Sequence, residues 1–128
     1  MSLLNWLRKS EGEDPTPAKA GEIPQLGSRD NLDEVLEQDS VMIFKHSTAC
    51  PVSWAAHLQV MKFRDEFPDF PLRMVPVIQE RAMSNKIAER TGVRHESPQV
   101  LLVKRGEVAG TISHGSITIA QLKQLATK

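Results

Sequence analysis

The chain has 128 residues, enough for one domain with a hydrophobic core of its own. Its 16 lysines and arginines balance its 16 aspartates and glutamates, so no net charge attracts it to nucleic acid or to an anionic membrane. No apolar run approaches the ~20 residues of a membrane span, and residues 1–9 are too short and wrongly charged for a signal peptide. We therefore expect no nucleic-acid partner and no membrane partner.

Residues 1–26 are expected to form an N-terminal arm and linker. Residues 10–21 (SEGEDPTPAKAG) are acidic, contain proline and glycine, and have almost no large apolar side chain, which is typical of a linker. The apolar cluster within residues 3–7 is either a frayed terminus, which we favour, or an amphipathic turn that docks on the domain or on a partner. The folded domain is predicted to span residues 27–128.

The first half of that domain reads as helix, strand, helix, strand. Ser28 is a candidate N-cap for a short helix that runs to Gln38. Residues 41–44 are an unbroken apolar run, which predicts a strand buried on both faces. A long helix then ends near Pro68, and residues 72–78 predict a second strand. A strand, helix and strand with this spacing indicate parallel pairing with a right-handed connection.

The second half reads as helix, hairpin, helix. A helix around Met83 is closed by Gly92, a favoured residue just beyond a helix end. Residues 97–104 and 108–112 are apolar strands joined by a tight turn, which predicts a β-hairpin. Thr118 and a glutamine three residues later form a capping box that begins the last helix.

Cys50 is the only cysteine, and it lies just beyond the carboxyl end of the first strand. Pro51 suits the first turn of a helix, so the cysteine is at or beside a helix N-cap. A helix N-terminus stabilises a thiolate over a thiol, and Lys45 and His46 are candidates to add positive charge. Ser53 follows one turn later, where its hydroxyl could donate a hydrogen bond to the sulfur. The sequence Cys-Pro-Val-Ser is thus a C-x-x-C redox motif with its second sulfur replaced by oxygen.

Plainer interpretations stand beside these. A lone cysteine is more often a small buried apolar residue than a nucleophile, although the helix-start position favours a nucleophile here. Ser53 has equal claims as a functional residue and as a helix residue that bonds its own backbone. Lys45 could be a solvated lysine after a strand. The four histidines are too scattered for a zinc site, so no metal is expected.

The chain resembles the thioredoxin-like superfamily in two features. One is a C-x-x-S motif that opens the first major helix, and the other is Ser97-Pro98 at the start of the hairpin. The resemblance implies an α/β fold with a central mixed four-stranded β-sheet flanked by helices on both faces. It also implies that Pro98 is cis and lies against the sulfur of Cys50.

Three segments narrow the resemblance to the monothiol bacilliredoxins, the YtxJ-like family of the bacillithiol system. They are residues 45–53 (KHSTACPVS), residues 95–100 (HESPQV), and Ser113-His114 followed by Ile117-Thr118. Ala49 departs from the pattern, where threonine is expected. The resemblance implies Cys50 as nucleophile, Ser53 in the resolving position and Pro98 as the cis-proline. The residues that we expect around the substrate are Lys45, His46, Pro51, Ser97, Pro98 and His114.

The implied function is a monothiol thiol-disulfide oxidoreductase that removes a low-molecular-weight thiol, expected to be bacillithiol, from client proteins. No cofactor is expected beyond that co-substrate, and a partner oxidoreductase or an external thiol must regenerate Cys50. A single cysteine forms no internal disulfide, which fits a cytoplasmic protein. Two alternatives remain open: a monothiol glutaredoxin-like carrier of an iron-sulfur cluster, and a thioredoxin-like interaction module without enzymatic activity.

Overall fold

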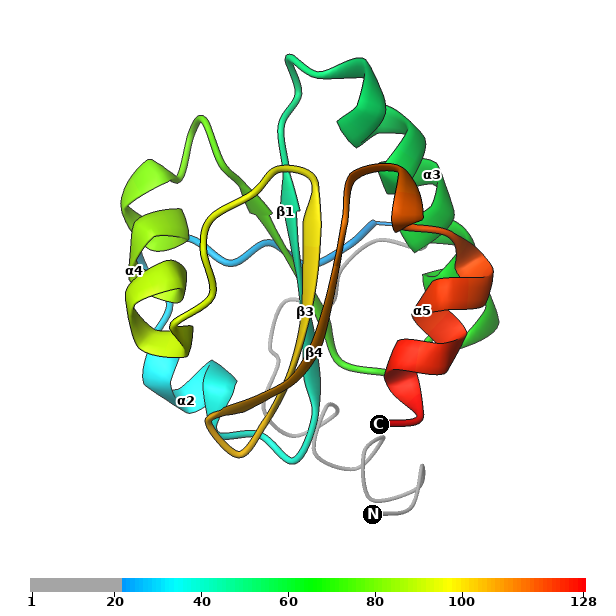
Figure 1. Cartoon of the computed structure of the whole chain (residues 1–128). Helices are drawn as coiled ribbons and strands as arrows, with labels where there is room; N and C mark the ends of the chain where they lie inside the picture. Colours follow the sequence, from blue (N-terminus) through cyan, green and yellow to red (C-terminus); the bar gives the residue numbers. More distant parts are fainter. Residues whose placement is uncertain (1–21) are drawn as a thin grey trace.

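The computed structural model describes residues 22–128, which form one sheet between two helical layers (Figure 1). The elements in chain order are α2 (Leu32–Leu36), β1 (Val41–His46), α3 (Pro51–Glu66), β2 (Leu72–Pro76), α4 (Arg81–Thr91), β3 (Gln99–Lys104), β4 (Glu107–Ser113), the short 3₁₀ helix η1 (His114–Ser116) and α5 (Ile119–Ala126). This order confirms the predicted sequence of helices and strands.

The four strands are arranged β2-β1-β3-β4. β1 pairs in parallel with β2, whereas β1 and β3, and β3 and β4, pair antiparallel. Helices α2 and α4 cover one face of this sheet, and α3 and α5 cover the other (Figure 1). The predicted mixed four-stranded sheet flanked by helices on both faces is therefore confirmed.

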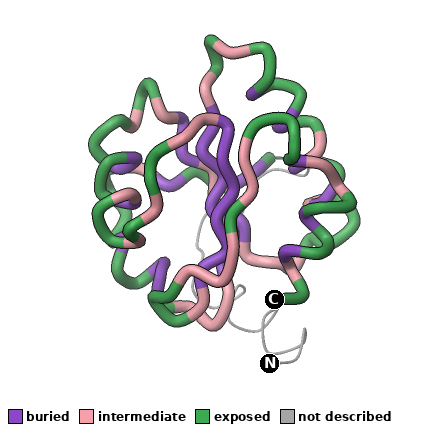
Figure 2. Tube along the Cα trace, in the orientation of Figure 1, coloured by how far each residue is buried: buried purple, intermediate pink, exposed green. Residues whose placement is uncertain are grey.

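Two apolar cores, one on each face, hold the layers together. Met42 and Phe44 of β1 pack toward α3 and α5, while Val41 and Ile43 pack toward α2 and α4. All six residues of β1 are buried, and Figure 2 shows the buried strands in the middle of the molecule. A central strand with helices on both faces needs such a continuous apolar run, as residues 41–44 predicted.

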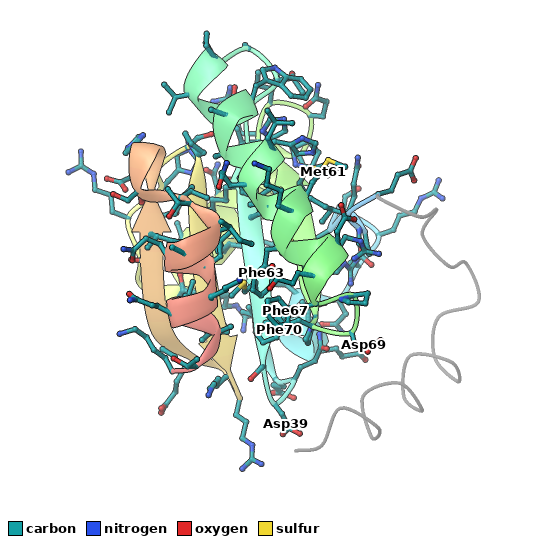
Figure 3. The ribbon with its side chains drawn as sticks, turned by 90° about the vertical axis from the view of Figure 1, so that its right-hand side faces the viewer. Asp39, Met61, Phe63, Phe67, Asp69 and Phe70 are labelled. Carbon is teal, nitrogen blue, oxygen red and sulfur yellow. The ribbon has the colours of Figure 1, made fainter. Side chains whose placement is uncertain are left out.

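The far end of α3 is fixed by phenylalanines. The ring of Phe63 lies 5.0 Å from that of Phe67 and 5.6 Å from that of Phe70, between ring centres. Figure 3 shows these three side chains gathered where α3 ends and the chain turns back toward β2. This cluster anchors the end of α3 that is remote from Cys50.

Local signals set most element ends. Gly92 is in the left-handed region with φ 71°, and the hairpin turn has positive φ at Arg105 and Gly106. The hydroxyl of Thr118 accepts a hydrogen bond from the Gln121 N–H. These observations agree with the predicted helix end, hairpin turn and capping residue.

The start of the domain differs from the prediction in two places. The N-cap of α2 is Asn31, whose side chain accepts hydrogen bonds from two backbone N–H groups, and not Ser28. Ile23 and Leu26 are buried, and the Leu26 N–H bonds the Met74 carbonyl oxygen on the edge strand β2. Packing therefore extends to residues before 27, because the apolar side chains of Ile23 and Leu26 belong to the two cores.

The predicted linker at residues 10–21 and the apolar cluster in residues 3–7 lie outside the described residues. Within residues 22–128, no helix is long and apolar enough to cross a membrane.

Candidate active site

Cys50 is the N-cap of α3. Its backbone is extended, with φ −118° and ψ 121°, and Pro51 occupies the first helical position. The Cys50 carbonyl oxygen accepts a hydrogen bond from the Trp54 N–H, the first of the helix. Cys50 is partly exposed, and its side chain makes no hydrogen bond to the first turn of the helix.

Ser53 is fully buried one turn into α3. Its oxygen accepts a hydrogen bond of 2.8 Å from the Ser47 N–H and lies 2.8 Å from the His46 Nδ1. Among the described residues, the structure shows no hydrogen bond between this hydroxyl and the Cys50 sulfur, which the sequence had left as one of two interpretations. Ser53 instead ties the end of β1 and the start of the Cys50 loop to the helix.

His46 lies in a cluster of rings beneath that loop. Its ring centre is 4.8 Å from those of Trp54 and His57, and 5.4 Å from that of Phe44. Burial, and then the nearby His57, lower the pKa of His46 from 6.5 to about 4, against the opposing effect of its hydrogen bond with Ser53. His46 is therefore neutral at pH 7. It supplies no positive charge to Cys50, which corrects our expectation.

A pocket of about 320 Å³ opens beside the loop. Its lining includes His46, Trp54 and His57, together with Met74 and Pro76 of β2. Cys50 does not line the pocket, although the pocket reaches Thr48 within the same loop. The pocket therefore lies beside the loop that carries Cys50 and does not include the Cys50 side chain.

The Ser97–Pro98 peptide bond is cis, which is the isomer that the resemblance implies. Lys45 of β1 pairs with Gln99 of β3, so one further step of this antiparallel register puts Pro98 across from His46. The Pro98 carbonyl oxygen accepts a hydrogen bond of 2.9 Å from the His114 N–H. The segment that contains Pro98 thus reaches the same end of the sheet as Cys50.

The other expected substrate residues differ in exposure. Pro51 and His114 are exposed, and the His114 imidazole lies 3.9 Å from the Glu96 carboxylate. Ser97 is partly buried, and its hydroxyl oxygen has no hydrogen-bond partner. Their contact with substrate stays a prediction.

Lys45 has the opposite placement to the one we expected. Its side chain is completely buried on the face of the sheet that α4 covers, away from α3. Its ammonium group donates to the Ser84 carbonyl oxygen and to His95 Nδ1, both at 3.2 Å. Neither a solvated lysine nor a residue in direct contact with substrate fits this arrangement. Strand alternation decides the face, because His46 and Lys45 point in opposite directions.

Four residues lie outside the expected site residues. Trp54 and His57 line the pocket, and Ser84 and His95 contact Lys45. No local signal in the sequence gives these contacts. Trp54 is half exposed, and its indole N–H donates a hydrogen bond of 2.9 Å to the Thr48 carbonyl oxygen. Within residues 22–128, no group of three or more His, Cys, Asp or Glu side chains is placed to hold a metal ion.

The sequence profile of the family described as Monothiol bacilliredoxin BrxC matches residues 24–122. The chain belongs to the monothiol bacilliredoxin family. The match covers all three motif segments, including the C-x-x-S motif and the Ser97-Pro98 pair. With this fold, membership makes the protein a thiol oxidoreductase of the thioredoxin-like superfamily.

Solved structures agree on the fold. A protein described as having a thioredoxin fold is 37% identical, with a TM-score of 0.75 over 83% of this chain and 95% of its own. Thioredoxin from Trypanosoma brucei brucei superposes with a TM-score of 0.70 at 13% identity, over 89% of this chain and 96% of its own. Thioredoxin from Malassezia sympodialis superposes with a TM-score of 0.67 at 18% identity, over 88% of this chain and 94% of its own. The bacilliredoxin thus keeps the thioredoxin architecture at low identity.

Proposed function

We propose that this bacilliredoxin removes a low-molecular-weight thiol, bacillithiol, from mixed disulfides on client proteins. The observation that carries the proposal is the number and place of its sulfurs. Cys50 is the only cysteine, it caps α3, and Ser53 occupies the position of a resolving cysteine. An oxidoreductase built in this way forms a disulfide only with another molecule.

The exchange balances with one thiolate. The Cys50 thiolate attacks the sulfur of the small thiol, a bond forms between these two sulfurs, and the bond between the small thiol and the client breaks. The client sulfur leaves as a thiolate and takes a proton from solvent. The disulfide is transferred, so no outside oxidant is needed. A second small thiol or a partner oxidoreductase then releases Cys50 by the same reaction, which we place in the cytoplasm, where thiols stay reduced.

The substrate backbone has a suitable neighbour in Ser97. The Ser97 N–H and carbonyl would bind a substrate that lies along the loop, as an added strand would. Pro51 and His114 are exposed on the surface around this site, and His46 lines the adjoining pocket. We assign substrate contact to these residues, and to Cys50 the chemistry.

Intact-mass spectrometry tests the proposal directly. The protein is incubated with a peptide that carries bacillithiol on its cysteine, and in parallel with a peptide that carries glutathione. We expect the protein to gain the mass of one bacillithiol while the peptide leaves as a free thiol, with a slower reaction for glutathione. Cys50→Ser should gain nothing.

Three results would contradict the proposal. The peptide could remain attached to Cys50, the two thiols could react at the same rate, or Cys50 could react only after denaturation. Bound iron and a coloured protein would favour the iron-sulfur alternative instead.

A further inference from the structure

Lys45 is buried but has no acidic partner. Its side chain is fully enclosed between β1 and α4, and none of the ion pairs within residues 22–128 includes it. Its two hydrogen bonds go to uncharged acceptors, the Ser84 carbonyl oxygen and His95 Nδ1. Burial accordingly lowers the pKa of Lys45 to about 8.

Packing alone does not account for a lysine at this position. A buried amine without a carboxylate destabilises a fold relative to an apolar side chain of the same length. The partners of Lys45 in the sheet, Val75 and Gln99, carry no charge, whereas a methionine at position 45 would bring no charge to desolvate. The contacts of the ammonium group must therefore be considered for what they hold in place.

Those contacts hold the segment that leads to Pro98. Residues 92–98 connect α4 to the start of β3 and form no helix or strand. They run beside the sheet (Figure 1). Two adjacent side chains of the central strands bind the middle of this segment. The Lys45 ammonium group binds His95, and the Gln99 side-chain amide donates a hydrogen bond of 3.1 Å to the Arg94 carbonyl oxygen. Ser84 of α4 adds a third link, because its hydroxyl lies 3.1 Å from the same His95 nitrogen.

We propose that Lys45 is a positioning residue for thiol exchange, which acts through His95 to hold the Ser97–Pro98 backbone at the end of the sheet that carries Cys50. The inference rests on the proposed function, since it assumes that this backbone binds the substrate. Lys45 itself touches no substrate. Its removal should loosen the segment and weaken substrate binding while leaving the sulfur and its helix start unchanged.

The charges around His95 suit this role. An ammonium group only donates hydrogen bonds, so His95 must accept through an unprotonated Nδ1. Burial, and then the nearby cations Lys45 and Arg81, lower the pKa of His95, whereas Glu96 opposes them. His95 is thus kept neutral at pH 7, in the form that accepts the bond.

Four variants of the full chain test the proposal. Lys45→Met removes the amine at nearly constant volume, and Lys62→Met removes an exposed lysine from α3 as its control. His95→Leu removes the acceptor. His95→Asn restores it, because the asparagine oxygen lies about as far from the backbone as Nδ1 does. His95 is exposed, so the two His95 variants should fold and keep the test valid if Lys45→Met does not fold.

Three measurements separate positioning from general damage. We expect Lys45→Met and His95→Leu to raise the KM for a bacillithiolated peptide about tenfold, the size expected for a lost bond to a charged group. Hydrogen exchange of the backbone amides in residues 93–97 should become faster, and Pro98 has no amide hydrogen to exchange. Alkylation of Cys50 by iodoacetamide should stay close to that of the unaltered protein, and His95→Asn and Lys62→Met should behave like the unaltered protein in all three.

The outcomes are separable. Unchanged amide exchange and KM in both Lys45→Met and His95→Leu would overturn the proposal, as would a parallel loss of alkylation and exchange activity. If the unaltered protein transfers no bacillithiol, the proposed function fails, and amide exchange together with the rescue by His95→Asn still decides whether Lys45 positions the segment.

Discussion

Ser53 stands where a dithiol oxidoreductase has its second cysteine, and its hydroxyl is used inside the fold. It accepts from the Ser47 N–H and contacts His46 Nδ1, both at 2.8 Å. The replacement of sulfur by oxygen therefore does two things at once. It removes internal resolution of a mixed disulfide, and it braces the loop that carries Cys50.

Ser53→Ala should lower stability more than thiol reactivity. The change leaves the Ser47 N–H and the His46 ring without their partner in a buried place, which costs about 1–3 kcal/mol for an unsatisfied group. Denaturant unfolding measures the loss, with the exposed Ser116→Ala as control. A variant as stable as the unaltered protein, with much slower alkylation of Cys50, would instead show that Ser53 acts on the sulfur.

His46 should make the fold weaker in mild acid. Burial lowers its pKa from the ordinary 6.5 to about 4 in the fold, so between these pH values the unfolded chain binds the proton and the fold does not. Stability should therefore fall as the pH is lowered through this window and then level off for this group. The pKa of His57 is also lowered by burial, and it acts in the same direction.

Unfolding measured at several pH values checks this behaviour. His46→Asn keeps an acceptor for Ser53 and does not titrate, so its stability should depend less on pH between about 4 and 6.5. An equally steep dependence in the variant would assign the effect to other groups.

At the scale of elements, Gly110 allows α5 to lie close against β4. A Cβ atom at this position would come within 2.7 Å of Leu125 Cδ1, and Leu125 is buried in the core beneath α5. Gly110→Ala should therefore push the helix away and cost about 1–3 kcal/mol, as overpacking does.

Thermal unfolding of Gly110→Ala measures this cost. Gly115→Ala is its control, because a Cβ there meets no atom within 4 Å. Equal melting temperatures for the two variants would mean that α5 moves aside freely, and that the contact between α5 and β4 does not limit stability.

At the scale of the whole molecule, residues 23–26 connect the two cores. Ile23 packs into the core between the sheet and α3, and Leu26 packs into the core between the sheet and α4. The backbone between them adds a parallel bridge to β2, from Gln25 to Met74. This segment thus covers the edge of the sheet at β2 and contributes one apolar side chain to the core on each face.

Leu26→Ala should destabilise the protein by about 2–5 kcal/mol, the range for deleting a buried leucine side chain. Gln25→Ala, at an exposed neighbouring position, should change stability little. Denaturant unfolding of both variants in the full chain measures the difference. A small loss for Leu26→Ala would show that the edge of β2 tolerates the absence of this cover.

The sequence by itself determined the order of the elements, the position of Cys50 at a helix start and the hairpin near the C-terminus. These features depend on neighbouring residues: apolar periodicity, a proline at the first helical position, and residues such as Gly92 and Gly106 that adopt positive φ. The resemblance of three short segments then sufficed to name the family.

Only the tertiary structure decided where the polar side chains around the site point. Lys45 bonds to residues 39 and 50 positions away in the sequence. The Gln25 carbonyl oxygen accepts a hydrogen bond from Arg73 of β2, which is 48 positions away. No local pattern encodes such partners, because each bond needs two distant segments to be packed first. That packing decides which face of the sheet buries Lys45. It also makes His46 neutral and gives Ser53 its partners.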